Sequence, residues 1–166
     1  MRQWKKYFFA SVGSVLTVLQ IVLCFFLYSE AGLEVLRCVG WAILAVSGFF
    51  GWMPIFILRR KGGVPEGKSY VHTTLLVDTG IYAVVRHPQS GLAWILLNLA
   101  LPLIAQHWLI GVIGVASMVP AYLDTREEDK YLVEKFGDAY ERYMQSVPGI
   151  NFLAGVIRLV RRRKPG

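Results

Sequence analysis

Two short polar motifs hold the residue types in this chain that could do chemistry. The first covers residues 80–88, with the sequence GIYAVVRHP, and lies between two hydrophobic blocks. It ends in Arg86, His87 and Pro88. Arginine offers a permanent planar fork of donors for carboxylate or phosphate, whereas histidine can donate, accept or titrate near neutral pH. Because charge beside a bilayer is costly unless it pairs or binds a ligand, this motif is a candidate functional site.

The second motif is acidic. Glu127, Glu128 and Asp129 follow a hydrophobic block closely, so we expect them at the same membrane face as Arg86 and His87. Adjacent carboxylates near lipid repel each other unless cations or ligand hydroxyl groups satisfy them. A cofactor with an amine, a sulfonium and a ribose diol offers such partners. The two motifs therefore predict a ligand pocket at one membrane face.

The elements that must position these motifs are membrane helices. Of the 166 residues, 55% are hydrophobic and 13% aromatic, and the mean hydropathy of +0.46 is too high for an ordinary soluble domain. Several uncharged blocks are long enough, or nearly so, to cross the bilayer as helices. We predict one all-α domain over residues 1–166, a polytopic membrane helical bundle with about four spans, at residues 7–28, 39–58, 91–104 and 108–123.

Three further segments lie outside these spans. Residues 59–79 contain glycines and a proline and predict a loop, long enough to be functional in its own right. Residues 124–143 are charged and rich in helix formers, which predicts a helix with a break near Gly137. Residues 150–164 combine apolar bulk with a basic end, which predicts an interfacial helix.

The distribution of positive charge predicts orientation and partners. Lys and Arg are retained on the cytoplasmic side, and only Arg37 falls in the opposite compartment, so both termini are predicted to be cytoplasmic. The net charge of +7 suits anionic lipid headgroups, and no basic face with stacking aromatics indicates nucleic acid. Cys24 and Cys38 show no metal-ligand or disulfide spacing and are interpreted as apolar fillers. The predicted cytoplasmic basic residues include Arg2, Lys5, Lys6, Arg59, Arg60, Lys61, Lys68, Arg86, Arg126 and Lys164.

Isolated polar residues in the hydrophobic blocks have a structural interpretation. Gln20, Ser47 and Asn98 are expected to form hydrogen bonds between helices, and Asn98 is also a candidate for substrate contact because it follows the first motif. His72 and His107 have no supporting residues nearby and are predicted to be structural.

The two motifs together resemble a known family. The run LVDTGIYAVVRHP, then two spans, then EDKYLVEKFGDAYERYMQSVP is similar to the integral-membrane methyltransferases that include isoprenylcysteine carboxyl methyltransferase and the phospholipid N-methyltransferases. The resemblance covers Leu75 to Pro148, and the first two spans match only in being hydrophobic. It implies an enclosed cytoplasm-facing pocket for S-adenosylmethionine, built from residues 75–90 and 124–148, and a lipid substrate that enters sideways from the bilayer.

The resemblance also implies individual roles. Arg86 and Glu128 would be catalytic, with Arg86 orienting or neutralising the acceptor group. Ser90 stands where the family usually has an aromatic residue, and Asp129 stands where glutamate is commoner. The residues implied to bind the cofactor are Tyr82, His87, Pro88, Glu128, Asp129, Leu132 and Tyr143.

The implied reaction is methyl transfer from S-adenosylmethionine to a membrane lipid or a lipidated small molecule. A prenylcysteine-like carboxylate is already ionised at neutral pH and is preferred, whereas a lipid amine needs a base such as His87 or Glu128. The alternative is a non-catalytic structural or partner-binding membrane protein on the same scaffold, which Ser90 favours. A transporter or channel subunit is less favoured because no ionisable path crosses the spans. The sequence specifies no oligomeric state.

Overall fold

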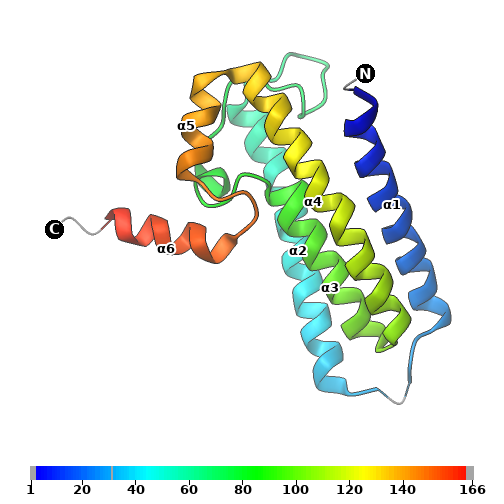
Figure 1. Cartoon of the computed structure of the whole chain (residues 1–166). Coiled ribbons are helices and arrows are strands. Elements are labelled where there is room, and N and C mark those ends of the chain that lie inside the picture. The colour runs from blue at the N-terminus through cyan, green and yellow to red at the C-terminus, as the bar shows by residue number, and fades with distance from the viewer. Residues whose placement is uncertain (1–2, 31, 164–166) are drawn as a thin grey trace.

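The computed structural model describes residues 3–30 and 32–163, and within those ranges it contains helices and turns but no strand. The predicted all-α fold is confirmed (Figure 1). Arg2 and Lys164, which were assigned to the cytoplasmic side from sequence, lie outside the described residues. The helices are α1 (Gln3–Phe26), α2 (Glu34–Lys61), α3 (Trp94–Ala105), α4 (Trp108–Phe136), α5 (Asp138–Ser146) and α6 (Phe152–Arg163).

Four of the described helical segments are long and apolar enough to cross a membrane, as predicted. In the bundle α1 packs on α4 and α2 packs on α3, while α3 also contacts α1 and α4 (Figure 1). The α3–α4 hairpin therefore lies at the centre of the bundle. Along the sequence, this hairpin connects the first motif to the second. The four segments are Tyr7–Phe26, Glu34–Lys61, Pro88–Ala105 and Trp108–Phe136.

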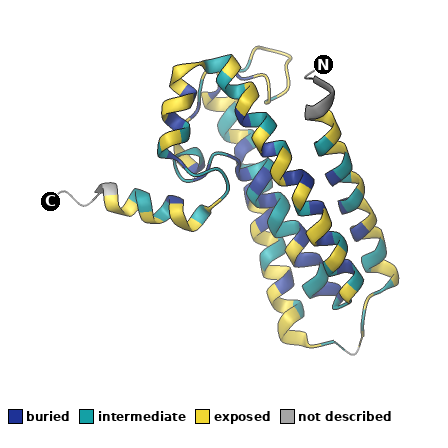
Figure 2. Cartoon of the chain, in the orientation of Figure 1, coloured by how far each residue is buried: buried dark blue, intermediate teal, exposed yellow. Residues whose placement is uncertain are grey.

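The outer surface of the bundle is apolar. Phe25 and Phe26 are 81% and 79% exposed, and Trp52 on α2 is 67% exposed. The buried residues concentrate on the faces where the helices meet (Figure 2). Large apolar side chains that face outward on long helices suit contact with lipid acyl chains.

The interior of the bundle is partly polar. Gln20 on α1 donates from Nε2 to the carbonyl oxygens of Asn98 on α3 and Ile110 on α4, at 3.1 and 3.0 Å. Thr17 donates to Asn98 Oδ1 at 3.2 Å, and Ser47 on α2 donates to the Ala93 carbonyl at 2.8 Å. The predicted interhelical hydrogen bonds of Gln20, Ser47 and Asn98 are confirmed.

The two loops at the end of the bundle away from the motifs are joined by Gln106. Its side chain accepts a hydrogen bond from Leu33 N and donates one to Leu33 O, each 2.7 Å long. Gln106 has φ 53°, which ends α3 and closes the turn into α4. His107 Nδ1 then accepts a hydrogen bond from Leu109 N at the start of α4, so His107 has a structural contact of the predicted kind.

The third span begins earlier than predicted. Residues 91–104 were expected, but the helical path starts at Pro88 with a π-helical segment, η2 (Pro88–Ala93), and runs directly into α3. The carbonyl of His87 accepts hydrogen bonds from Gly91 N and Leu92 N, at 3.2 and 3.0 Å. Proline has no N–H to lose in a first turn, so Pro88 starts this segment without cost.

The fourth span is longer than predicted. Residues 108–123 and the charged helix of residues 124–143 were expected to be separate, but α4 continues without interruption from Trp108 to Phe136. The residues after Asp124 are good helix formers and nothing in them ends a helix. The predicted break at Gly137 is confirmed: its φ of 58° and ψ of −141° are readily adopted only by glycine, and α5 turns back from that point (Figure 1).

Candidate active site

The turn that presents Arg86 and His87 is held by its backbone. It starts with a 3₁₀ turn, η1 (Gly80–Ala83). Arg86 N donates to the Pro148 carbonyl at 3.0 Å, and His87 N donates to the Gly149 carbonyl at 2.9 Å. The segment that follows α5 therefore pairs with the motif and fixes the direction of both side chains.

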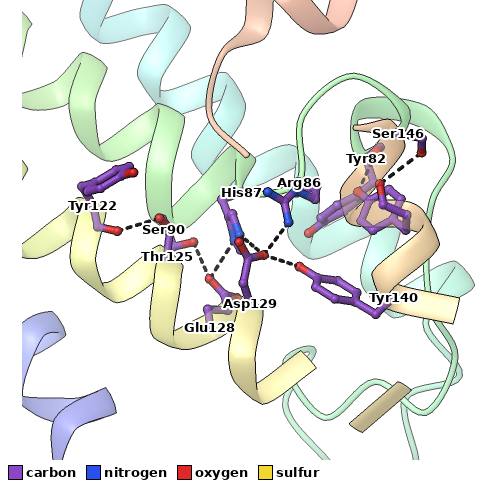
Figure 3. Close-up of polar contacts among 11 residues, drawn as sticks. Tyr82, Arg86, His87, Ser90, Tyr122, Thr125, Glu128, Asp129, Tyr140 and Ser146 are labelled. Carbon is purple, nitrogen blue, oxygen red and sulfur yellow. Dashed lines mark hydrogen bonds and ion pairs between the residues drawn. The ribbon is translucent and has the colours of Figure 1, made fainter. Parts of the chain in front are cut away.

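His87 lies between two carboxylates. Its Nδ1 is 3.1 Å from Glu128 Oε2, and its Nε2 is 2.8 Å from Asp129 Oδ1 (Figure 3). Burial by itself lowers the pKa of His87, but the hydrogen bonds to Asp129 and Glu128 outweigh burial and raise this pKa to about 9. His87 is therefore a doubly hydrogen-bonded imidazolium at neutral pH.

Asp129 is the point where three side chains meet. Besides His87, its Oδ1 accepts hydrogen bonds from Arg86 Nη1 at 2.9 Å and from the Tyr140 phenol at 2.7 Å (Figure 3). The side chains of Arg86 and Asp129 are only 9% and 7% exposed. With Glu128, the cluster contains two cations and two anions, so buried charge is compensated within it.

Glu128 is the more exposed of the two carboxylates, with 37% of its side chain accessible. Its Oε2 accepts a hydrogen bond from Ser90 Oγ at 2.7 Å in addition to its contact with His87 (Figure 3). Ser90 is thus a donor in the site and not merely a missing aromatic wall. Sequence reasoning missed this contact, because only the turn of η2 brings Ser90 to face α4.

Two tyrosines of α5 attach this helix to the site. The Tyr143 phenol donates to the Tyr82 carbonyl at 2.6 Å, whereas Tyr140 donates to Asp129. The two rings pack edge to face with centroids 5.6 Å apart. Burial, above all, raises the pKa of Tyr140 and of Tyr143 well above the ordinary value, so both remain neutral donors.

A cavity of about 700 Å³ opens beside this cluster. It is lined by every residue proposed from sequence as catalytic or cofactor-binding except one. The structure does not bring Asp129 to the cavity wall; Asp129 lies behind His87 and Arg86. The lining residues proposed from sequence are Tyr82, Arg86, His87, Pro88, Glu128, Leu132 and Tyr143.

The loop between α2 and η1 forms another wall of the cavity. Tyr70 to Val77, apart from Thr74, line it, and the Tyr70 phenol donates to Gln89 Oε1 at 3.1 Å. The base of the loop is fixed by hydrogen bonds from the backbone N–H groups of Thr74 and Leu75 to the Gly62 carbonyl. The length of this loop was a signal of function, and Leu75 to Val77 belong to the pocket segment of residues 75–90 expected from the resemblance. His72, which was expected to be structural, lines the cavity as well.

The cavity walls suit a ligand that is cationic at one point and carries hydroxyl groups. Asp124 and Glu128 contribute carboxylates, and Tyr82, Tyr131 and Phe136 contribute aromatic rings. Carboxylates accept hydrogen bonds from amines and hydroxyl groups, and aromatic faces attract cations. Mixed walls and a volume of this size are typical of small-molecule sites.

Comparison with known proteins agrees with this chemistry. The chain is 34% identical over 133 residues to the protein-S-isoprenylcysteine O-methyltransferase of Homo sapiens, which covers 73% of this chain and 45% of the relative. It is 34% identical over 95 residues to that of Mus musculus, covering 56% of the chain and 32% of the relative. It is 32% identical over 101 residues to that of Schizosaccharomyces pombe, covering 55% of the chain and 42% of the relative.

The chain is homologous to the isoprenylcysteine O-methyltransferases. The resemblance inferred from the two motifs is thereby confirmed. This isoprenylcysteine O-methyltransferase homologue is an integral membrane protein, and its described residues include four apolar helices of spanning length. It spans less than half the length of each of these relatives. No protein-family model and no solved structure matches it.

Proposed function

We propose that the protein transfers a methyl group from S-adenosylmethionine to the carboxylate of a prenylcysteine at the cytoplasmic membrane face. The observation that carries the proposal is the position of His87, held between Glu128 and Asp129 on the wall of the cavity. The contact joins the two motifs that resemble those of the methyltransferase family and builds a polar wall beside an apolar one.

The cavity residues fit S-adenosylmethionine. Glu128 and Asp124 can accept hydrogen bonds from its ribose hydroxyl groups and its amine, and the rings of Tyr82, Tyr131 and Phe136 can face its adenine and sulfonium. When bound, this cofactor supplies an electrophilic methyl group with its own leaving group. The protein then has to align the acceptor and exclude water.

The state of His87 favours a carboxylate acceptor over an amine. A general base must be unprotonated, but both ring nitrogens of His87 face carboxylates and its pKa is raised to about 9. An amine acceptor would have to lose a proton before attack, whereas a carboxylate acceptor is ionised at neutral pH and needs no base.

Arg86 is suited to hold an acceptor carboxylate. Its side chain lines the cavity, and its Nη1 is bonded to Asp129, which holds the guanidinium group in place. A guanidinium group matches a carboxylate in geometry and charge. In the proposed reaction an acceptor oxygen bonds to the methyl carbon as the carbon–sulfur bond breaks, which gives a neutral ester and a neutral thioether.

The apolar walls of the cavity fit a prenyl chain. Tyr7 comes from α1, Leu58 from α2, and Leu75 and Leu76 from the loop between α2 and η1. Residues of two helices of spanning length therefore reach the same cavity as the charged cluster. This arrangement supports a lipid substrate whose reactive end lies at the membrane surface.

We also propose that both termini are cytoplasmic, because Lys and Arg are concentrated in the segments on that side of the predicted spans.

The cofactor site is tested by binding of S-adenosylhomocysteine to the detergent-solubilised protein, measured by calorimetry. We expect micromolar binding by the wild type and loss of binding in His87→Ala and Glu128→Ala. The control is Glu127→Gln, because Glu127 forms an exposed pair with Lys130 and does not line the cavity. No binding by well-folded wild type would overturn the proposal and favour a structural membrane protein.

The acceptor is tested with labelled S-adenosylmethionine and two substrates, a small prenylcysteine and a lipid amine such as phosphatidylethanolamine. A carboxyl methyl ester releases labelled methanol in mild base, whereas an N-methyl product does not. We expect base-labile product from the prenylcysteine. Base-stable labelling of the amine lipid alone would contradict the carboxylate assignment while leaving the cofactor site intact.

A further inference from the structure

Helix α6 leaves the bundle sideways (Figure 1). It carries a stripe of exposed apolar side chains. Leu153 is 72% exposed, and Ile157 and Val160 are each 53% exposed. These positions are spaced by four and three residues, so they share one face of the helix. A stripe of this kind on an amphipathic helix next to a membrane bundle suits the boundary between headgroups and acyl chains.

Other side chains of α6 contact the turn that presents Arg86 and His87. Arg158 Nη2 donates a hydrogen bond to the Ala83 carbonyl. Gly155 packs so closely against the Val84 carbonyl oxygen that no Cβ atom fits between them. The ring of Phe152 meets Phe50 of α2 at 5.3 Å between centroids. The position of α6 therefore bears directly on the backbone just before Arg86.

Two arginines lie beside the apolar stripe. Ala154, Ile157, Arg158 and Arg161 line a shallow hollow of about 530 Å³ along α6. Arg158 Nε is buried and has no hydrogen-bond partner among the residues that the structure describes. Guanidinium groups match phosphate oxygens in geometry and charge, and the neighbouring apolar side chains match the start of an acyl chain. This combination is the chemistry of an anionic phospholipid.

We propose that α6 is a docking surface for an anionic phospholipid of the surrounding bilayer, and that lipid bound there holds the Arg86–His87 turn in place. The two guanidinium groups complement the charge of the lipid, and the exposed apolar stripe on the same helix complements its acyl chains. The effect on the cofactor cavity rests on the function proposed above, whereas lipid docking itself does not.

Docking is tested by reconstituting the protein in mixed phosphatidylcholine and phosphatidylglycerol, re-extracting it and measuring the retained lipid by mass spectrometry. We expect phosphatidylglycerol to be enriched on the wild type. Arg161→Gln should lower that enrichment about five-fold, the effect of one basic residue at an anionic surface. Arg60→Gln removes the same charge from an exposed position at the end of α2 that does not line the hollow, so it should lower the enrichment less than Arg161→Gln. An equal fall in both variants would indicate a general charge effect and would overturn the docking surface. Equal retention by wild type and Arg161→Gln would overturn the docking surface.

The link to the cavity is tested in nanodiscs of phosphatidylcholine with and without phosphatidylglycerol, by calorimetry with S-adenosylhomocysteine. We expect phosphatidylglycerol to tighten binding several-fold in the wild type and in Arg60→Gln but not in Arg161→Gln. Gly155→Val, which separates α6 from Val84, should retain phosphatidylglycerol and lose the tightening. The same affinity in both lipids would overturn the link. No binding in either lipid would overturn the proposed function, and lipid retention would still decide docking.

Discussion

His87 and Asp129 are 42 positions apart, yet His87 Nε2 lies 2.8 Å from Asp129 Oδ1. The α3–α4 hairpin runs away from the site and returns to it, so this contact closes the hairpin at its open end (Figures 1 and 3). The two motifs are therefore brought together by the same helices that fill the centre of the bundle. Substitutions that break this contact should lower the free energy of unfolding and weaken the proposed cofactor binding.

Asp129→Asn should be strongly destabilising. The substitution keeps the size of the side chain but leaves the buried cations of Arg86 and His87 without their shared partner. Removing one member of a buried ion pair costs about 3–5 kcal/mol in free energy of unfolding. Denaturant unfolding in mixed micelles measures this cost. A change below 1 kcal/mol, as we expect for Glu127→Gln at the exposed pair with Lys130, would show that Asp129 does not organise the site.

Tyr140→Phe and Tyr143→Phe should differ in severity. Tyr140 donates to a buried carboxylate, and a hydrogen bond to a charged group is worth about 1.5–3 kcal/mol. Tyr143 donates to the neutral carbonyl of Tyr82, which is worth about 1 kcal/mol. The free energies of unfolding of the two variants measure the difference. The opposite order would mean that the phenol of Tyr140 is not bonded to Asp129.

The stability of the protein should fall in mildly alkaline solution. The pKa of His87 rises from 6.5 to about 9 in the folded protein because the hydrogen bonds to Asp129 and Glu128 outweigh burial. A folded pKa above the unfolded value means that the stabilisation is complete below pH 6.5 and is lost as the pH rises through about 9. Thermal unfolding across this range should show the loss in the wild type and a flatter profile in His87→Asn. Parallel profiles would contradict the assigned protonation of His87.

Ser90→Ala should weaken S-adenosylhomocysteine binding by up to about ten-fold, because Glu128 loses a donor that fixes its carboxylate. Ser90→Thr keeps the hydroxyl group and should restore most of the affinity. Calorimetry on the three proteins measures the effect. Equal affinities in wild type and Ser90→Ala would show that His87 suffices to hold Glu128.

Gln20→Leu should be mild although Gln20 is fully buried. Its two hydrogen bonds to Asn98 and Ile110 are lost, but so is the Oε1 atom that has no partner among the described residues. Interhelical hydrogen bonds in membranes average about 0.6 kcal/mol. Gly114→Val should cost more, because a Cβ atom there would lie 2.6 Å from Gln20 Nε2 and 2.8 Å from the Asn98 carbonyl. Unfolding in mixed micelles ranks the two variants, and a larger loss in Gln20→Leu would contradict this account.

Much of the fold follows from local pattern. Hydrophobic blocks of spanning length predicted the four long helices, and glycine at position 137 predicted the end of α4. The start of the third span could not be predicted, because hydropathy detects where apolar residues begin and not where a helical backbone begins. For the same reason the sequence predicted two helices, divided at Asp124, in place of α4. The charged residues there indicate where the chain leaves the bilayer for water, but they do not end a helix.

The sequence predicted which residues form the candidate site, but not how their side chains are arranged. The motifs placed Arg86, His87 and Glu128 at one membrane face, and the cavity contains all three. That Asp129 lies behind them depends on the rotation of α4, since neighbouring helix positions point about 100° apart. The hydrogen bond from Ser90 to Glu128, and the position of Tyr70 to Thr73 on the cavity wall, depend on backbone turns that no side-chain pattern encodes.

The backbone conformation of Gly137 decides whether α5 folds back on the site or continues α4. With φ 58° it reverses the chain after α4, so that α5 returns and Tyr140 reaches Asp129. Alanine there does not readily adopt this conformation and would favour continuing the helix, because alanine and the residues on both sides are helix formers. The cavity would then lose the wall that Tyr140 and Tyr143 provide and become an open groove. A groove that opens toward the membrane fills with lipid. One added methyl group would therefore let lipid molecules occupy the proposed small-molecule site.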